Sequence, residues 1–272
     1  MGEPEQKLSY PNKIALIGNY LPRQCGIATF TTDLRASLAA ENPTGDCWVI
    51  AMNDVPEGYR YPGQVRFEIN QRILSDYRLA ADFLNMNRVE VACLQHEFGI
   101  FGGDNGAHIL DLISNLRMPL VTTLHTVLNS PSAGQLSLTK RIAQLSDRIV
   151  VMSRRAMQIL HEVYGVPEEK IVHIQHGIPD VPFWDPNYFK DQYGVEGRKV
   201  LMTFGLLSPG KGIETMIEAL PAIVARHPET VYIVLGATHP HVIKEQGESY
   251  RLSLQRRARE LGIGDHLVLI RK

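Results

Sequence analysis

A short apolar run, a glycine-rich turn and an amphipathic helical pattern follow one another directly between Lys199 and Leu220. The run from Val200 to Phe204 ends at Gly205, which predicts a parallel strand buried on both faces. Beyond the turn, apolar residues recur at helical spacing: Ile213, Met216, Ile217, Leu220, Ile223 and Val224. We therefore expect a helix that packs one face back onto this strand.

The turn itself has the composition of an anion site. Gly205, Gly210 and Gly212 allow a ligand to approach the backbone closely, and the first turn of the helix offers unpaired N–H groups. Lys211 adds a positive charge, a combination suited to the phosphates of a nucleotide or nucleotide-sugar. The spacing matches the start of a P-loop, but Gly212 stands where a P-loop needs a Ser or Thr for magnesium. The alternative is an ordinary strand-to-helix turn with a surface lysine.

The same alternation of apolar runs and helical patterns continues through the chain. Further strands are expected in the runs 13–19, 48–52, 65–69, 89–97, 119–125, 148–153, 170–177 and 267–270. Helical faces are expected at Phe30, Leu34 and Leu38, across residues 77–84, and across 250–261. This regular alternation predicts an α/β protein with doubly wound parallel sheets.

The length of 272 residues favours two domains. The segment 179–197 is rich in proline and aromatic residues and has neither a strand nor a helix period, so it is the expected linker. The predicted domains are residues 1–178 and residues 198–272.

Bulk properties exclude several classes of function. A net charge of -1 gives no general attraction to nucleic acid or to anionic membranes. Three distant cysteines without a C-x-x-C pair argue for a reducing compartment and against structural zinc. No signal peptide and no transmembrane run are present in the sequence, so a cytoplasmic protein is expected.

Polar residues at the carboxyl ends of the expected strands are candidates for a ligand site, because open α/β sheets bind ligands at that edge. They are His96, Glu97, His125 and His176, together with Arg23 and Gly26 in the turn after the first run. That turn lacks the G-x-G-x-x-G spacing of a dinucleotide fold. Each residue also has a structural alternative: a hydrogen-bonded histidine, a solvated arginine, or a glycine that only permits the turn. His96 and Glu97 are adjacent and would point to opposite faces of a strand, which disfavours a metal site.

Four segments together resemble glycosyltransferase family 4. They are Thr123-Leu-His-Thr126, Ser146-Asp-Arg-Ile-Val-Val-Met-Ser153, Ile171-Val-His-Ile-Gln-His-Gly-Ile178 and Phe204-Gly-Leu-Leu-Ser-Pro-Gly-Lys-Gly-Ile213. The resemblance implies the GT-B architecture of two Rossmann-like domains, with an acceptor-side domain first and a donor domain second. It also implies retaining transfer of a sugar from a nucleoside-diphosphate sugar to an acceptor hydroxyl of a carbohydrate, polyol or lipid-linked sugar, with no cofactor and no essential metal.

The resemblance also assigns roles to individual residues. His125 would contact the transferred sugar as the catalytic residue. Gly26, Gly205, Gly210 and Lys211 would hold the donor diphosphate, and Arg23, His96, Glu97 and His176 would line the cleft.

The chain departs from the family pattern in two places. The family usually has an arginine at the position of Leu206, and the paired-glutamate motif expected beyond Ile270 is absent. We therefore expect a C-terminally incomplete donor domain and a chain inactive by itself. The alternatives are a phosphate-binding module or inactive remnant, and then a P-loop nucleotidase. The sequence names neither the sugar, the base, the acceptor nor the oligomeric state.

Overall fold

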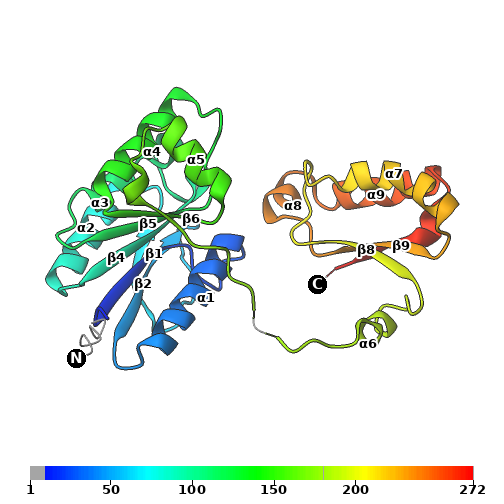
Figure 1. Cartoon of the computed structure of the whole chain (residues 1–272), viewed down its shortest axis with the longest axis horizontal. Helices are drawn as coiled ribbons and strands as arrows, with labels where there is room; N and C mark the ends of the chain where they lie inside the picture. Colours follow the sequence, from blue (N-terminus) through cyan, green and yellow to red (C-terminus); the bar gives the residue numbers. More distant parts are fainter. Residues whose placement is uncertain (1–9, 180, 272) are drawn as a thin grey trace, which may run out of the picture. The chain divides into compact units, whose positions relative to one another are not determined.

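The computed structural model describes residues 10–179 and 181–271 of the chain (Figure 1). The chain divides into two compact units, Met1–Ile178 and Pro179–Lys272. Each unit contains its own parallel sheet and its own buried apolar clusters.

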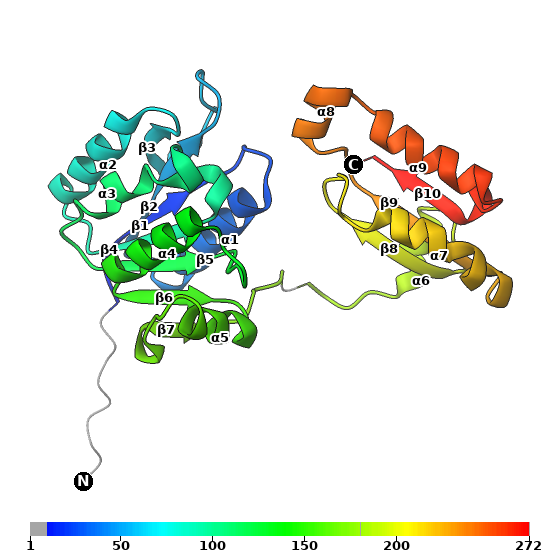
Figure 2. The ribbon, with the colours of Figure 1, turned by 90° about the horizontal axis from the view of Figure 1, so that it is seen from above.

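The first unit is built on a seven-stranded parallel sheet with the order β3-β2-β1-β4-β5-β6-β7 (Figures 1 and 2). Its strands are β1 (Lys13–Gly18), β2 (Asp46–Asn53), β3 (Val65–Asn70), β4 (Val91–His96), β5 (Leu120–Leu124), β6 (Arg148–Val151) and β7 (Ile171–His173). Its helices are α1 (Gly26–Glu41), α2 (Leu74–Met86), α3 (Ile109–Ile113), α4 (Ala133–Leu145) and α5 (Arg154–Glu162).

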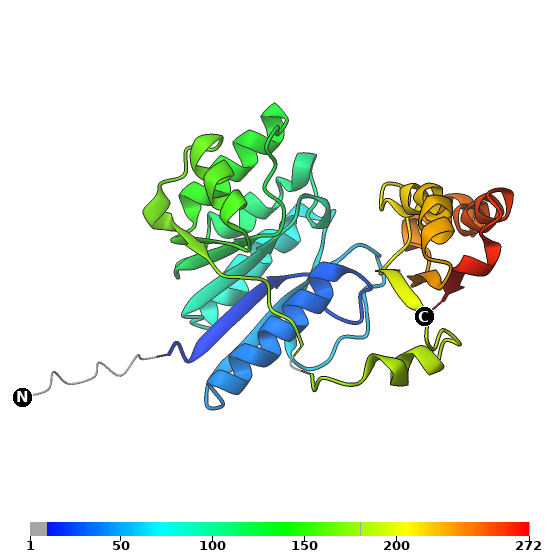
Figure 3. The ribbon, with the colours of Figure 1, turned by 45° about the vertical axis from the view of Figure 1, so that its right-hand side comes forward.

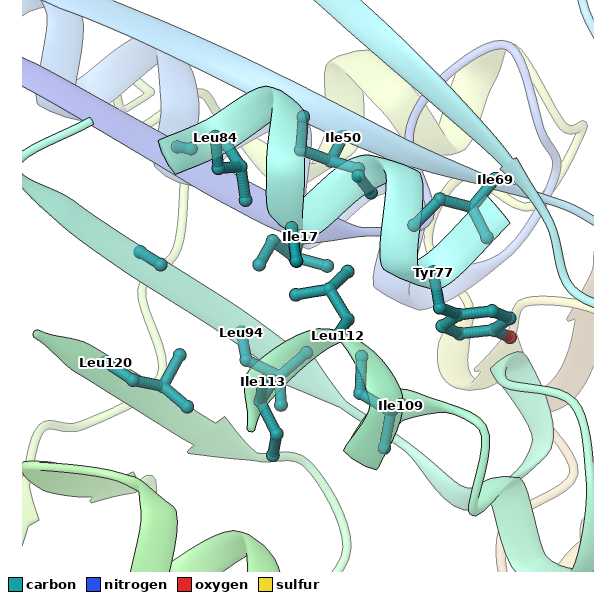
Figure 4. Packing of buried hydrophobic residues seen from close by; sticks show 14 of the residues in the cluster. Ile17, Ile50, Ile69, Tyr77, Leu84, Leu94, Ile109, Leu112, Ile113 and Leu120 are labelled. Carbon is teal, nitrogen blue, oxygen red and sulfur yellow. The ribbon is translucent and has the colours of Figure 1, made fainter. Parts of the chain in front are cut away.

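Side chains that alternate along β1 enter different cores on the two faces of this sheet. Ile17 belongs to the buried cluster that also contains Leu84 of α2 and Leu112 of α3 (Figure 4). Leu16 lies in another cluster, against Leu34 of α1. Figure 3 shows α1 on the opposite side of the sheet from the green helices. Helices therefore cover both faces, which confirms the predicted doubly wound sheet.

The strand order reverses direction between β1 and β4. From β1 the chain proceeds outward through β2 to β3, whereas β4 to β7 extend on the other side. The two central strands are closely apposed near their carboxyl ends, because a Cβ atom on Gly18 would lie 3.0 Å from Cβ of Gln95. Open α/β sheets bind ligands beyond the carboxyl ends of strands at such a reversal point. The turn containing Gly26 follows β1 and thus starts at this point.

The second unit has a three-stranded parallel sheet with the order β10-β9-β8. Its elements are α6 (Pro186–Asp191), β8 (Lys199–Phe204), α7 (Ile213–Arg226), β9 (Thr230–Leu235), α8 (Pro240–Gln246), α9 (Ser249–Glu260) and β10 (Leu267–Ile270). Tyr232 and Val234 of β9 pack in the cluster that contains Leu220 of α7 and Leu254 of α9. Strand, glycine turn and helix succeed one another between Lys199 and Leu220 as predicted.

The prediction that residues 200–204 are buried on both faces is wrong. β8 is an edge strand of the sheet, and Met202 and Phe204 are 57% and 79% exposed. An apolar run signals burial only if other elements cover it, and that depends on strand order, which the run does not encode.

The expected linker also contains more structure than its composition indicated. Residues 186–191 form α6, in which the side chain of Asp185 accepts a hydrogen bond from Asn187 N. Val195 is buried and clusters with Val231 and Ile233 of β9. The later part of the segment 179–197 therefore packs as part of the second unit.

Candidate functional site

The β8–α7 turn has the geometry of a backbone ligand site. Gly205, Gly210 and Gly212 have φ values of +120°, +86° and +74°, a region that favours glycine. Gly212 is the N-cap of α7 and provides no side-chain cap, so the N–H groups of the first helical turn are open at this end. The helix dipole makes this end partly positive.

A pocket lies beside this turn. Lys211 is exposed, and its ammonium group has no partner within residues 10–179 and 181–271. The pocket is lined by Thr203, Phe204, Gly205, Leu206, Leu207, Lys211, Ile213 and Val234. Thus Gly205 and Lys211 share one pocket, and Leu206 contributes an apolar side chain to it.

The turn is braced by the segment that follows β9. Leu207 pairs with Thr238 in an isolated parallel bridge, and Leu207 O accepts a hydrogen bond from His239 N at 2.8 Å. These backbone contacts hold the β8–α7 turn in place and need no side chain from the pocket. The β8–α7 turn is consequently part of the folded unit.

In the first unit, the turn after β1 leads into a second helix N-terminus. Cys25 is the N-cap of α1, and its Sγ accepts hydrogen bonds from Ala28 N and from Asn19 Nδ2, at 3.3 and 3.1 Å. Gly26 is exposed, and a Cβ atom placed on it would meet nothing within 4 Å. Sterically, the exposed Gly26 backbone is therefore accessible to a ligand.

Arg23 is not a solvated side chain. Only 11% of it is exposed, and its guanidinium donates to Asn19 Oδ1 at 2.9 Å and to Met52 O at 3.1 Å. It also forms an ion pair with Asp54 at 3.3 Å. Because these partners come from the ends of β1 and β2, Arg23 ties the β1–α1 turn to the neighbouring strand.

His125 lies directly after β5, next to the end of β4. Its Nε2 is 3.1 Å from Gln95 Oε1, and the ring of Phe30 meets the imidazole edge-on with the centroids 4.7 Å apart. Burial, and to a lesser extent the neighbouring His176, lowers the pKa of His125 to about 4. The imidazole is therefore neutral at physiological pH.

His96 requires a correction, because the structure contradicts its predicted position on a cleft. It has no exposed surface and packs against the rings of Phe98 and Phe101. Neither ring nitrogen has a hydrogen-bond partner in the part of the chain that the structure describes. Burial, with a smaller contribution from His125, lowers the pKa of His96 to about 4.

Glu97 and His176 are placed differently from His96. Glu97 accepts hydrogen bonds from Phe98 N and from the hydroxyl of Thr126, so its carboxylate fastens the loops after β4 and β5. His176 is exposed, and its ring meets Phe30 edge-on with the centroids 5.3 Å apart. Phe30 therefore contacts both His125 and His176.

Two residues that contact His125, Gln95 and Phe30, are not among the site residues predicted from the sequence. Phe30 was read only as part of the apolar face of α1, and a glutamine next to a strand end carries no chemical signature of its own. The clue for Gln95 was its place immediately before His96. Among the described residues, no group of three or more His, Cys, Asp or Glu side chains could hold a metal ion.

A comparison with protein families decides the classification. The family model for Glycosyltransferase Family 4 matches residues 25–180, which is more than half of the chain. The chain belongs to glycosyltransferase family 4. The match starts at Cys25 and contains Gly26, the end of β4 and the loop with His125, and it ends before the β8–α7 turn.

A mannosyltransferase is among the proteins whose sequences are similar to this chain. The chain is 29% identical over 136 residues to a GDP-mannose-dependent alpha-(1-6)-phosphatidylinositol monomannoside mannosyltransferase of Mycolicibacterium smegmatis. That alignment covers 48% of this chain and 33% of the relative, so the chain matches about a third of the relative's length.

Solved structures extend the likeness over almost the whole chain. A glycosyltransferase from Rickettsia africae is 14% identical with a TM-score of 0.68, and covers 97% of this chain and 69% of its own. Anabaena HepE in complex with UDP-glucose is 15% identical with a TM-score of 0.64, and covers 95% and 69%. These matches confirm the predicted GT-B fold class, with the second sheet partly present. None of the helices in the described ranges is long and apolar enough to cross a membrane.

Proposed function

We propose that this chain forms part of an enzyme that transfers a sugar from a nucleoside-diphosphate sugar to an acceptor hydroxyl, with retention of the anomeric configuration. Membership of glycosyltransferase family 4 is the observation that carries the proposal. The β8–α7 turn adds chemical support, since it combines an open helix N-terminus, three glycines with positive φ and an ammonium group that has no partner among the described residues.

Lys211 and the N-terminus of α7 would stabilise the negative charge that grows on the departing diphosphate. The exposed backbone at Gly26 would offer N–H groups to a donor phosphate. No protein nucleophile is proposed: the acceptor hydroxyl would attack on the face of the leaving group, and the diphosphate would take its proton. No essential metal is proposed, because Lys211 and two helix ends could supply the positive charge.

Leu206 leaves one cation fewer than the family pattern has at this turn. A charge-assisted hydrogen bond contributes about 1.5–3 kcal/mol, so either another cation replaces the missing arginine or transfer is slow. Arg23 is a poor substitute, because its charge is already paired with Asp54. Glu97 and His176 would lie near the acceptor.

His125 would contact the transferred sugar and strengthen its hydrogen bond as the sugar-phosphate bond breaks. An interaction made only in the transition state raises turnover without tightening ground-state binding. We therefore expect His125→Ala to lower kcat about 100-fold, while the affinity for the nucleoside diphosphate stays nearly unchanged.

The assay uses a form of the protein whose donor domain includes the paired glutamates of the family pattern. It follows release of nucleoside diphosphate from UDP-glucose and from GDP-mannose, with His241→Ala as the control because His241 is an exposed residue of α8. Normal turnover of His125→Ala would remove this residue from the chemistry. Tight diphosphate binding without any turnover of either donor would favour the non-catalytic binding module instead.

A further inference from the structure

We infer that Gln95 is a positioning residue: its amide selects the Nε2–H form of the His125 imidazole and leaves the Nδ1 lone pair available to a ligand. The inference rests on the proposed contact between His125 and the transferred sugar, and it specifies the chemistry of that contact. A ring nitrogen with a lone pair accepts a hydrogen bond, so His125 would bind a sugar hydroxyl as an acceptor.

The hydrogen bond between the two residues carries the first step. Gln95 Oε1 lies 3.1 Å from His125 Nε2, and an amide oxygen can only accept. Nε2 must therefore carry the proton in this arrangement. A neutral imidazole has a single N–H group, so Nδ1 keeps its lone pair.

Burial and sheet geometry hold the two side chains together. Among the described residues, the buried Gln95 amide nitrogen has no hydrogen-bond partner, so the contact with His125 is the interaction that orients the amide. Gln95 is 1% exposed, so water cannot readily take the place of its amide. It lies on β4, which pairs with β5 in the register Gln95↔Thr123 and His96↔Leu124, and His125 N donates to His96 O at 3.0 Å. Both partners are thus held by the backbone ladder of adjacent strands.

The surroundings of His125 keep the ring neutral and fix its plane. The ring of Phe30 stands at 88° to the imidazole, from the first turns of α1. Burial, and then His176 after β7, lowers the pKa of His125, so both disfavour a second proton. His96 at the end of β4 is the other titratable neighbour, and its own pKa is lowered in part by His125. Because the neutral ring carries one proton, Gln95 can determine which of the two ring nitrogens holds it.

The opposite amide orientation would give the opposite result. If the Gln95 amide nitrogen faced the ring, it would donate to Nε2, and the proton of His125 would reside on Nδ1. The tautomer of His125 in solution therefore reports directly on the proposal.

The test is nitrogen-15 NMR of the histidine side chains in the full 272-residue chain, with His125 assigned from the signals lost in His125→Asn. We expect the wild-type protein to show a protonated Nε2 and an unprotonated Nδ1. Gln95→Met, of similar volume but without an acceptor, should give a mixture of the two tautomers. Gln95→Glu should keep the Nε2–H form and raise the pKa of His125, because the acceptor becomes a carboxylate.

Gln175→Met is the matched control, since Gln175 is exposed in the same unit, and it should leave the His125 signals unchanged. A wild-type Nδ1–H tautomer, or a folded Gln95→Met protein with the wild-type signals, would overturn the proposal. The wild-type spectrum is decisive even if a variant fails to fold. Because these spectra need no donor, the expected tautomer in this chain, together with no sugar transfer by the form that includes the paired glutamates, would refute the proposed function alone.

Discussion

The carbonyl oxygen of Gly205 lies where a side chain on Gly236 would begin. A Cβ atom on Gly236 would be 1.9 Å from Gly205 O, and Gly236 has a φ of +150°. This contact joins the carboxyl ends of β8 and β9 at the place where the β8–α7 turn starts. The conformation of the β8–α7 turn therefore depends on Gly236, which lies outside the turn.

Gly236→Ala should lower the free energy of unfolding of the second unit by about 2–4 kcal/mol, because the Gly205 backbone has to move to admit a methyl group. Gly262→Ala is the matched control: Gly262 has a φ of +70° but open space around it, so only the backbone preference is lost, about 1 kcal/mol. Urea denaturation measures both. Equal losses in the two variants would show that the close approach has no energetic weight.

Lys211→Ala should weaken the binding of UDP or GDP about 10- to 100-fold, since one charge-assisted contact to a phosphate is removed. Adding magnesium should change the affinity little. Isothermal titration calorimetry tests both statements, with Lys244→Ala in α8 as a control of equal charge change. Unchanged affinity in Lys211→Ala would take the lysine out of the site, and a strict need for magnesium would support a P-loop mechanism.

His96 should make the first unit sensitive to acid. Its pKa is about 4 in the folded chain and 6.5 in the reference state, so the unfolded chain binds the proton more readily between these values. Above about pH 6.5, protonation of His96 does not affect the free energy of unfolding. As the pH falls from 6.5 towards 4, the free energy of unfolding decreases by on the order of 3 kcal/mol.

His96→Leu should flatten the pH dependence in this window, and denaturation curves at a series of pH values measure the difference. At neutral pH the variant should be at least as stable as the wild type, because it removes from the core two ring nitrogens that have no partner in the described part of the chain. The exposed His241→Ala should keep the wild-type slope. A large loss of stability in His96→Leu at neutral pH would mean that the ring nitrogens have a partner in solution.

Arg23→Ala should destabilise the first unit by about 2–3 kcal/mol, since Asn19 Oδ1 and Met52 O lose their buried donor. The exposed Arg60 lies in the loop after β2, and Arg60→Ala serves as the control with an expected loss below about 0.5 kcal/mol. Thermal and urea unfolding compare the two. Similar stability of both variants would show that the contacts of Arg23 with Asn19 and Met52 do not stabilise the first unit.

Local patterns predicted many elements of this fold, although β9 and the helices α3, α4, α5, α6 and α8 were not among them. The apolar runs of β1, β2, β4 and β5 and the helical spacing of α1 and α7 specify their own structure, because periodicity and turn residues act over a few positions. The sequence also predicts the glycine turn after β8, because three glycines between a strand and a helix indicate backbone positions with positive φ. The family resemblance rested on segments of the same local kind.

The environment of each side chain was decided by the tertiary structure. His96 and His125 both follow apolar runs, and nothing in either run shows that Phe98 and Phe101 cover one ring while Gln95 and Phe30 flank the other. The exposure of Phe204 depends in the same way on the edge position of β8, and the need for glycine at 236 on a carbonyl 31 positions earlier. Sequence alone determined many of the elements and the glycine turn after β8, because those preferences are local. Only the packing of distant segments determined burial, protonation and contact, because these depend on neighbours that the chain brings together when it folds.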